Sequence, residues 1–416
     1  MADSGSTVAG GAGSARDAAG PGRLLSLDAL RGFDMFWIVG AGALVGALDK
    51  MGGNAATRLL MTQLQHVQWA GFRFCDLIFP LFVFIAGVSL VFSTDRTLAR
   101  HSAGSAVARL ARRCGLLFVL GVLYYGGVGK VWADIRLLGV LQYIGLACFF
   151  GGAAYIALRN ARAVAALCAV LFLVHGLLME FAPFPDVRLD KASLAAAETR
   201  AGSIEPSKVL AAATAQVRGL YEEGRCFSNF VDYRFLPGRK INGAYESEPL
   251  LGVLGVVAAC LLGVLAGLWL RRADVSDPRK VAGLLAAGAA CVAIGVALSG
   301  QIPVVKKLWS PSFVLVAGGC SAMLLGLFHA VVEVGRMRRW CEPFVWIGMN
   351  PIAIYLARNI VRFPAIAARF AGGDVQRFLD TRIAKGSGSL LLALVELALT
   401  FLFVRFLYVR KIFIKL

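Results

Sequence analysis

Residues 250–270 read LLGVLGVVAACLLGVLAGLWL and contain no charged side chain. About 20 consecutive apolar residues span the hydrocarbon core of a bilayer as a helix. Similar apolar runs occur at 77–92, 281–298 and 390–407. Over all 416 residues, 58% of the side chains are hydrophobic and 16% are charged, against about 25% charged in an average soluble domain. The sequence therefore excludes a soluble enzyme and a disordered chain, and it predicts an all-α polytopic membrane protein.

Apolar windows predict about ten transmembrane helices. We expect them at 29–49, 74–93, 114–129, 137–158, 163–182, 249–270, 281–299, 312–334, 343–360 and 388–408. One long connection, 183–248, separates the fifth helix from the sixth; we expect helix over 189–218 and irregular structure over 227–248. Residues 1–22 are rich in Gly, Ala and Ser, and we expect a disordered tail rather than a signal peptide, followed by a single transmembrane domain at 23–416.

The distribution of basic residues predicts the orientation. With the N-terminus inside, the inner connections and chain ends carry 21 Lys and Arg, the short outer connections carry 13, and 183–248 carries 9. Cationic loops are retained on the cytoplasmic side, so we expect both termini in the cytoplasm and 183–248 outside. The net charge of +18 then reflects these loops, and because no basic patch is interleaved with aromatic residues, we expect no nucleic-acid partner.

The nine cysteines stand singly, without a CxxC or Cys/His cluster, so we expect neither a disulfide framework nor a metal site.

Charged residues at membrane depth are usually paired, exposed to a cavity, or functional. Asp28, Arg31 and Asp34 recur every three residues along one helix stripe. An Asp28–Arg31 ion pair and a direct contact with a ligand are both consistent with this spacing. Asp34 lies deeper and has no neighbouring cation in sequence, so it is the stronger candidate for a functional site.

His66 lies in a polar segment and belongs to the residue type best suited to move a proton near neutral pH. It is a candidate general base or acyl-carrying nucleophile, although a structural hydrogen bond explains a single histidine equally simply. Asp76 is the obvious residue to orient its imidazole. Ten residues of continuous helix would separate the two by about 15 Å, so direct contact requires the chain to bend near Gly71.

Two further segments carry polar groups near the expected helices. Asn350 places a donor and an acceptor at membrane depth, and Pro351 interrupts the helical hydrogen bonds; packing between helices and a functional role both fit. Lys306 and Lys307 either bind an anionic group or form a solvated interfacial face.

Several segments together resemble the heparan-alpha-glucosaminide N-acetyltransferase family of multispan membrane acyltransferases and its bacterial relatives. The matching stretches are LLSLDALRGFDMFWI (24–38), HVQWAGFRFCDLIFPLFVFIAGVSLVFS (66–93), IRLLGVLQYIGL (135–146), YRFLPGR (233–239), VVKKLWSPSFVLVAGG (304–319) and FVWIGMNPIAIYL (344–356). This resemblance implies an enzyme that uses cytoplasmic acetyl-CoA to acetylate an amino sugar or glycan on the far side of the membrane. His66, followed by Trp69 and Gly71, matches the family's active-site histidine. Where the lysosomal enzymes carry an Asn late in the first helix, this chain has Gly40-Ala41-Gly42.

The expected mechanism assigns roles to further residues. His66 deprotonates the acceptor amine or carries the acetyl group, Asp34 or Asp76 holds its tautomer, and Asn350 or Gln142 donates to the developing oxyanion. Substrate contacts are expected from Trp69, Arg31, Asp28, Gln142, Lys306 and Lys307. Cations for the phosphates of acetyl-CoA are expected from Arg112, Arg113, Arg271 and Arg272.

Other functional classes stay open at this point. A transporter or flippase for an anionic or glycan-linked solute also uses buried charge and a proline-broken helix, and a structural scaffold would need no reactive histidine. The Ala-, Gly-, Arg- and Val-rich composition and the family's relatives imply a bacterial inner membrane. Beyond the lipid bilayer and a glycan acceptor, a homodimer is the partner we consider.

Overall fold

The computed structural model describes residues 24–129 and 131–413, so the tail expected at 1–22 lies outside the described residues. Within these ranges, eight helical segments are long and apolar enough to cross a membrane. They are Leu25–Lys50 (α2, Leu25–Phe36; the π-helical turn η1, Trp37–Ala41; α3, Gly42–Lys50), α5 (Phe74–Leu98), α7 (Val140–Leu158), α8 (Ala161–Phe181), α12 (Gly252–Leu270), α13 (Asp277–Leu298), α14 (Pro311–His329) extended by η5 (Ala330–Val334), and α19 (Ser387–Val409). The chain is a multi-pass helical membrane protein.

Two of the ten expected spans differ from the prediction. The one at 114–129 belongs to α6 (Ala103–Tyr124), which begins eleven residues earlier and includes three arginines, at positions 109, 112 and 113. The one at 343–360 is broken at Asn350 into α15 (Glu342–Gly348) and α16 (Pro351–Ile360). Pro351 lacks the N–H that would continue the helical hydrogen bonds, so the helix breaks there. The two halves have 7 and 10 residues, and neither is long enough to span a bilayer alone. Shorter helices α4 (Ala55–Gln63), α17 (Phe363–Ala371) and α18 (Asp374–Arg382) lie in the connections.

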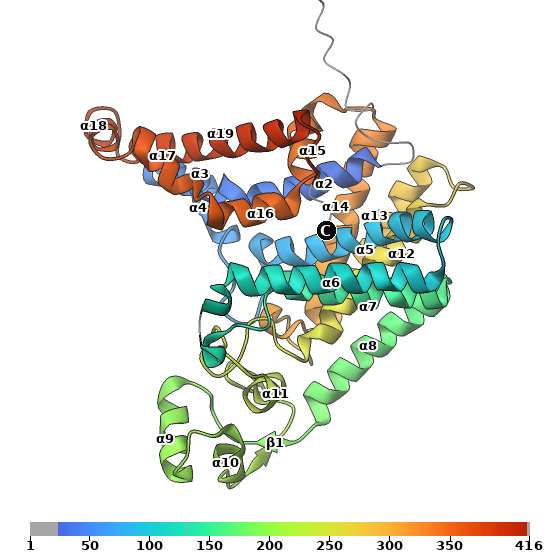
Figure 1. Cartoon of the computed structure of the whole chain (residues 1–416), viewed down its shortest axis with the longest axis vertical. Coiled ribbons are helices and arrows are strands. Elements are labelled where there is room, and N and C mark those ends of the chain that lie inside the picture. The colour runs from blue at the N-terminus through green and yellow to red at the C-terminus, as the bar shows by residue number, and fades with distance from the viewer. Residues whose placement is uncertain (1–23, 130, 414–416) are drawn as a thin grey trace, which may run out of the picture.

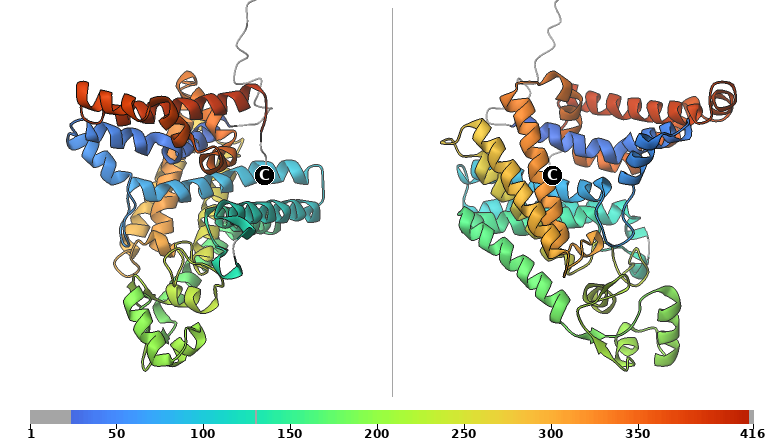
Figure 2. Two further views of the ribbon diagram at one scale, coloured as in Figure 1. Left: turned by 60° about the vertical axis from the view of Figure 1, so that its left-hand side comes forward. Right: turned by 180° about the vertical axis from the view of Figure 1, so that it is seen from behind.

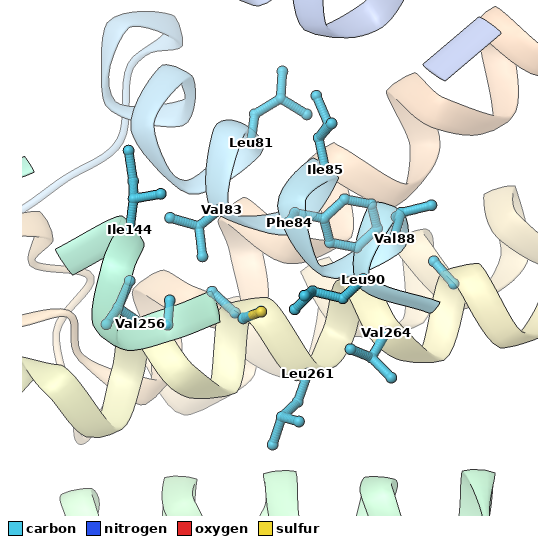
Figure 3. Packing of buried hydrophobic residues seen from close by; sticks show 14 of the residues in the cluster. Leu81, Val83, Phe84, Ile85, Val88, Leu90, Ile144, Val256, Leu261 and Val264 are labelled. Atoms are coloured by element: carbon cyan, nitrogen blue, oxygen red, sulfur yellow. The ribbon is translucent and has the colours of Figure 1, made fainter. Parts of the chain in front are cut away.

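The centre of the bundle is α5, which packs against α7 and α12 (Figure 1). Apolar side chains from all three helices fill the space between them, and Figure 3 shows Phe84, Ile144 and Val256 among them. Helices α5 and α12 can approach closely because Gly87 has no side chain. A Cβ at this position would overlap the carbonyl of Cys260. A Cβ on Gly348 would likewise overlap the carbonyl of Asp28, so α15 lies directly against α2.

Segment 183–248 folds into a small unit with its own core, and the views in Figures 1 and 2 show it protruding from one end of the bundle. It contains β1 (Phe184–Pro185), α9 (Lys191–Ala201), α10 (Pro206–Ala211), β2 (Gln216–Val217), β3 (Tyr221–Glu222), β4 (Arg225–Cys226) and α11 (Phe227–Phe235). Strands β1 and β2 pair antiparallel, as do β3 and β4. The helix expected over 189–218 is thus confined to α9 and α10. The irregular structure expected from 227 is wrong for α11, where Phe230 and Tyr233 pack on the core of the unit.

The connections separate into two groups, as the alternation of spans requires. At one face, Asp95 in the last turn of α5 accepts a hydrogen bond from Tyr155 Oη at 2.9 Å. It also pairs with Arg271 directly after α12 and with Arg159 directly after α7, the latter at 3.7 Å. At the other face, the segment around His66 contacts Lys306, and Arg136 contacts Glu246. Leu24 and Phe413, the described chain ends, line one cavity together with residues of the first face. Which face is cytoplasmic stays a prediction from the charge count.

Candidate functional site

The link between α4 and α5 provides the bend that contact between His66 and Asp76 requires. Helix α4 ends at Gln63 and α5 begins at Phe74. Gly71 has a φ of +128°, a backbone conformation that glycine adopts without steric cost. Its N–H donates to the Val304 carbonyl at 2.8 Å, so the link is pinned against the segment that precedes α14.

His66 and Asp76 form a hydrogen-bonded pair across this bend. Nδ1 of His66 lies 2.8 Å from Oδ1 of Asp76. The second carboxylate oxygen accepts from the backbone N–H groups of Val67 at 3.3 Å and Arg73 at 3.2 Å. Asp76 is 1% exposed, and a buried carboxylate held by several donors keeps a fixed orientation. The arrangement holds the Nδ1–H tautomer and leaves Nε2 as the reactive nitrogen.

Lys306 completes a three-residue charge cluster. Its ammonium lies 3.4 Å from Asp76 Oδ1 and 3.0 Å from His66 Nδ1. Because Nδ1–H donates to Asp76, it cannot also accept a hydrogen bond from Lys306, so the Asp76 carboxylate is the partner of both side chains. Hydrogen bonds to Asp76 and then to Cys75 raise the pKa of His66 to about 9, against the opposing effects of burial and the Lys306 charge. Burial lowers the pKa of Lys306.

The pair opens into a cavity of about 540 Å³, the outer cavity. The His66 side chain is 59% exposed and lines this space together with Lys306 and Glu248. Apolar residues of η1, α3, α5, α7 and α16 form most of the remaining wall, to which Arg358 and Glu396 add two further charged groups. Such a space, mostly apolar with a few convergent polar groups, is the usual form of a small-molecule site.

A second cavity of about 410 Å³, the inner cavity, lies toward the opposite face. It is lined by Arg31, Arg96 and Arg113, and the buried Nε of Arg113 has no hydrogen-bond partner within the described part of the chain. The two cavities share four wall residues, Phe82, Ile144, Pro351 and Ile352. The break between α15 and α16 therefore lies where the two spaces meet.

The residues expected from the first helix are divided between two environments. Arg31 donates to Asp28 at 3.2 Å and to Ser89 Oγ at 2.6 Å, and Asp28 and Arg31 also line the inner cavity. The ion pair and cavity exposure thus coexist. Asp34 is buried, and neither carboxylate oxygen has a hydrogen-bond partner among the described residues. It lines neither cavity, so the expectation that Asp34 orients His66 is wrong, and Asp76 occupies that position.

The two expected oxyanion donors also lie elsewhere. Gln142 is completely buried and faces Gly121 of α6, whereas Val140 and Leu141 line the outer cavity. Asn350 donates from Nδ2 to the carbonyl of Ile412 at 2.9 Å, which fits the packing role rather than a donor aimed into either cavity. Neither residue lines the cavity of His66.

Trp69 and Lys307 connect the His66 segment to the protruding unit. The Trp69 indole donates to the Tyr221 carbonyl at 2.5 Å, and Lys307 pairs with Glu223 at 2.5 Å. The Lys307 ammonium also lies 5.8 Å from the centre of the Trp69 ring. These contacts hold β3 against the face of the bundle that carries His66, and neither side chain lines the outer cavity.

Only one of the four arginines expected near the phosphates faces a central cavity. Arg113 lines the inner cavity. Arg112 is exposed beside Ser105, outside both cavities; Arg271 pairs with Asp95 and Arg272 with Asp274. The α-helical period explains the difference between Arg112 and Arg113, because successive residues of α6 point about 100° apart.

Cys75, Glu248 and Arg96 are among the cavity residues that were not expected from the sequence. Cys75 lines the outer cavity, and its Sγ lies 3.7 Å from Nε2 of His66. Glu248 lines the same cavity and is bonded by Arg136 at 2.6 Å, and Arg96 lines the inner cavity. The position of Cys75 directly before Asp76 was the only sequence signal for its proximity to His66.

Comparisons with known proteins find similar sequences that include this segment. Residues 23–198 match the family model described as heparan-alpha-glucosaminide N-acetyltransferase, catalytic, and this range includes both His66 and Asp76. The chain is similar to the heparan-alpha-glucosaminide N-acetyltransferase of Homo sapiens, with 27% identity over 382 residues that cover 82% of this chain and 53% of the human protein. It is similar to the enzyme of that name from Mus musculus, with 26% identity over 331 residues, or 71% and 49% of the two chains.

The alignments thus span about half the length of these relatives. They extend well beyond the 23–198 range of the family model. The matched range brings together the bend at Gly71, the His66–Asp76 pair and the central helix α5. The part of the chain that carries this site is therefore similar to heparan-alpha-glucosaminide N-acetyltransferases.

Proposed function

We propose that this protein is an integral-membrane acyltransferase that transfers an acetyl group from acetyl-CoA to the amine of an amino sugar or glycan at the opposite face. One observation carries the proposal. The cavity that contains the His66–Asp76 pair meets an arginine-lined cavity from the other face at four shared wall residues. The names of the relatives support acetyl transfer as the chemistry.

The inner cavity fits the anionic part of the donor. Arg31, Arg96 and Arg113 line it, and guanidinium groups suit phosphates because they donate in pairs. The unpartnered buried Nε of Arg113 is a donor that a phosphate oxygen would satisfy. Acetyl-CoA supplies the activated acetyl group as a thioester.

His66 acts on protons in this scheme. Asp76 holds Nδ1–H, so Nε2 accepts the proton that the acceptor amine loses when it attacks a carbonyl. Asp76 then stabilises the imidazolium that forms. Lys306, 3.0 Å from the His66 ring, provides positive charge beside the oxygen that becomes negative during acyl transfer.

The proposal includes an orientation. The arginine-lined cavity faces the cytoplasm, both termini lie on that side, and the protruding unit at 183–248 lies outside a bacterial inner membrane. The excess of basic residues in the connections of the first face supports this assignment. The acceptor then arrives at His66 from outside.

A transporter for an anionic or glycan-linked solute is the second candidate. Two cavities directed to opposite faces and joined at a proline-broken helix also occur where a solute moves through a protein. The two functions differ in one measurable respect, because a transporter does not consume acetyl-CoA.

The decisive experiment measures CoA release and acetylated product with detergent-purified protein, acetyl-CoA and glucosamine as acceptor. We expect turnover by the native chain and its loss, by about 100-fold or more, in His66→Ala. His101→Ala is the matched control, because His101 is exposed after α5 and lines neither cavity. Absence of CoA release from folded native protein, together with uptake of a glycan in liposomes, would favour the transporter.

A further inference from the structure

Cys75 lies on the reactive side of the His66 imidazole. Its Sγ is 3.7 Å from Nε2, while Nδ1 of the same ring is 2.8 Å from Asp76. A thiol, an imidazole and a carboxylate in this order form the arrangement by which cysteine enzymes activate their nucleophile. All nine cysteines lie in the described ranges, and Cys75 is the one with a hydrogen-bond contact to a histidine there.

The surroundings of Cys75 fit a reactive thiol. The residue is half-buried and lines the outer cavity, so a carbonyl carbon in that space can reach the sulfur. It occupies the first turn of the 25-residue helix α5, where the helix dipole favours negative charge. A thiolate is the attacking form of cysteine. Lys306, and the imidazolium that forms when His66 takes the thiol proton, place positive charge on the same side.

We propose that Cys75 is a catalytic nucleophile that carries the acetyl group as a thioester between donor and acceptor. This inference rests on the proposed acyltransferase function and deepens it. In this scheme Nε2 of His66 first accepts the proton of the Cys75 thiol and later accepts the proton of the acceptor amine.

The steps balance as two successive acyl transfers. His66 Nε2 takes the proton of the Cys75 thiol, the sulfur bonds to the acetyl carbon, and the bond from that carbon to the CoA sulfur breaks. His66 returns the proton to the departing CoA thiolate. In the second half, the acceptor amine bonds to the acetyl carbon, His66 takes the amine proton, and the Cys75–carbon bond breaks with the proton passing to the sulfur. No oxidant, reductant or metal takes part.

The test uses the full chain purified in detergent and acetyl-CoA with a radiolabelled acetyl group, without acceptor. After acid quenching, we expect label on the protein, release of this label by neutral hydroxylamine, and recovery of one labelled peptide that contains Cys75. Cys75→Ala should lose the label and slow acetylation of glucosamine at least 100-fold. Cys291→Ala is the matched control, because this residue is half-buried in α13 and lines neither cavity. A thermal melt of each variant checks that it folds.

Three results would overturn the inference and leave the acyltransferase intact: native-like turnover by folded Cys75→Ala, label on His66 instead of Cys75, or turnover by the native chain without any labelled protein. Cys75→Ser offers a second check, since its hydroxyl keeps the size and polarity of the thiol but attacks a thioester poorly. Native-like rates in Cys75→Ser would count against a nucleophilic thiol. If the native chain neither transfers nor hydrolyses acetyl-CoA, the proposed function itself fails.

Discussion

Replacing Asp76 with Asn should shift the pH dependence of acetyl transfer. Asp76 is the largest cause of the raised pKa of His66, about 9 instead of 6.5. A general base acts in its unprotonated form, so the kcat/KM of the native chain should rise with pH up to about 9. Removing the carboxylate charge lowers the pKa of His66, and the rise should then occur at lower pH. Because His66 is 59% exposed, solvent screens the interaction, and we expect a shift of at least about one pH unit rather than the whole difference.

The same substitution should lower the maximum rate. An Asn amide can donate to Nδ1 and thereby place the ring proton on Nε2, the nitrogen that has to accept a proton. The corresponding change in a Ser-His-Asp triad costs roughly 10⁴-fold in kcat, and we expect a loss of about 10²- to 10⁴-fold. The assay is kcat/KM for glucosamine acetylation between pH 6 and 10, with Asp374→Asn as the control, because that carboxylate is 94% exposed in α18. An unchanged pH profile with a native maximum would refute the assigned role of Asp76.

Two further predictions concern the donor cavity and the packing of the bundle. Arg113→Ala should raise the KM for acetyl-CoA about tenfold or more through loss of a charge-assisted hydrogen bond, while the KM for glucosamine and the variant Arg112→Ala stay near native; equal effects of the two variants would argue against a donor site at Arg113. Gly348→Ala should lower the midpoint of thermal unfolding in detergent by several degrees, because its Cβ would overlap the Asp28 carbonyl and overpacking costs about 1–3 kcal/mol. Gly115→Ala meets nothing within 4 Å and should leave that midpoint unchanged or raise it slightly, so equal destabilisation of both variants would contradict this account.

The positions of most membrane spans could be predicted because the cost of burying polar groups in lipid depends on local composition. Residues 250–270 illustrate this, since α12 covers Gly252–Leu270. The prediction failed where a local signal was ambiguous. The apolar window at 343–360 does not show whether a helix continues through Pro351, because that depends on whether neighbouring groups bond the freed carbonyls. Helix α6 begins before the apolar window on which the prediction was based, and the added turns contain three arginines that the window excluded.

The candidate site was predictable only in part, for a geometric reason. Contact between His66 and Asp76 required a bend, and Gly71 was the residue able to provide it. The proximity of Lys306 depends on how segments 240 residues apart pack together, which no local pattern encodes. Successive side chains of a helix point about 100° apart, so a difference of one residue decides whether a side chain reaches a cavity. Leu141 lines the outer cavity and Gln142 faces Gly121 for that reason.

The four residues shared by the two cavities form the boundary between them, and this boundary can block the passage of ions through the protein. Phe82, Ile144 and Ile352 are apolar, and Pro351 begins α16 beside them. An apolar boundary opposes the passage of ions because a charge loses its hydration there. An acyltransferase needs only a reactive carbonyl to reach His66, whereas a transporter has to admit a whole solute past these side chains. His66, Cys75 and Lys306 line the outer cavity, and three arginines line the inner one. This geometry favours transfer of a small group through a narrow boundary over movement of an entire molecule.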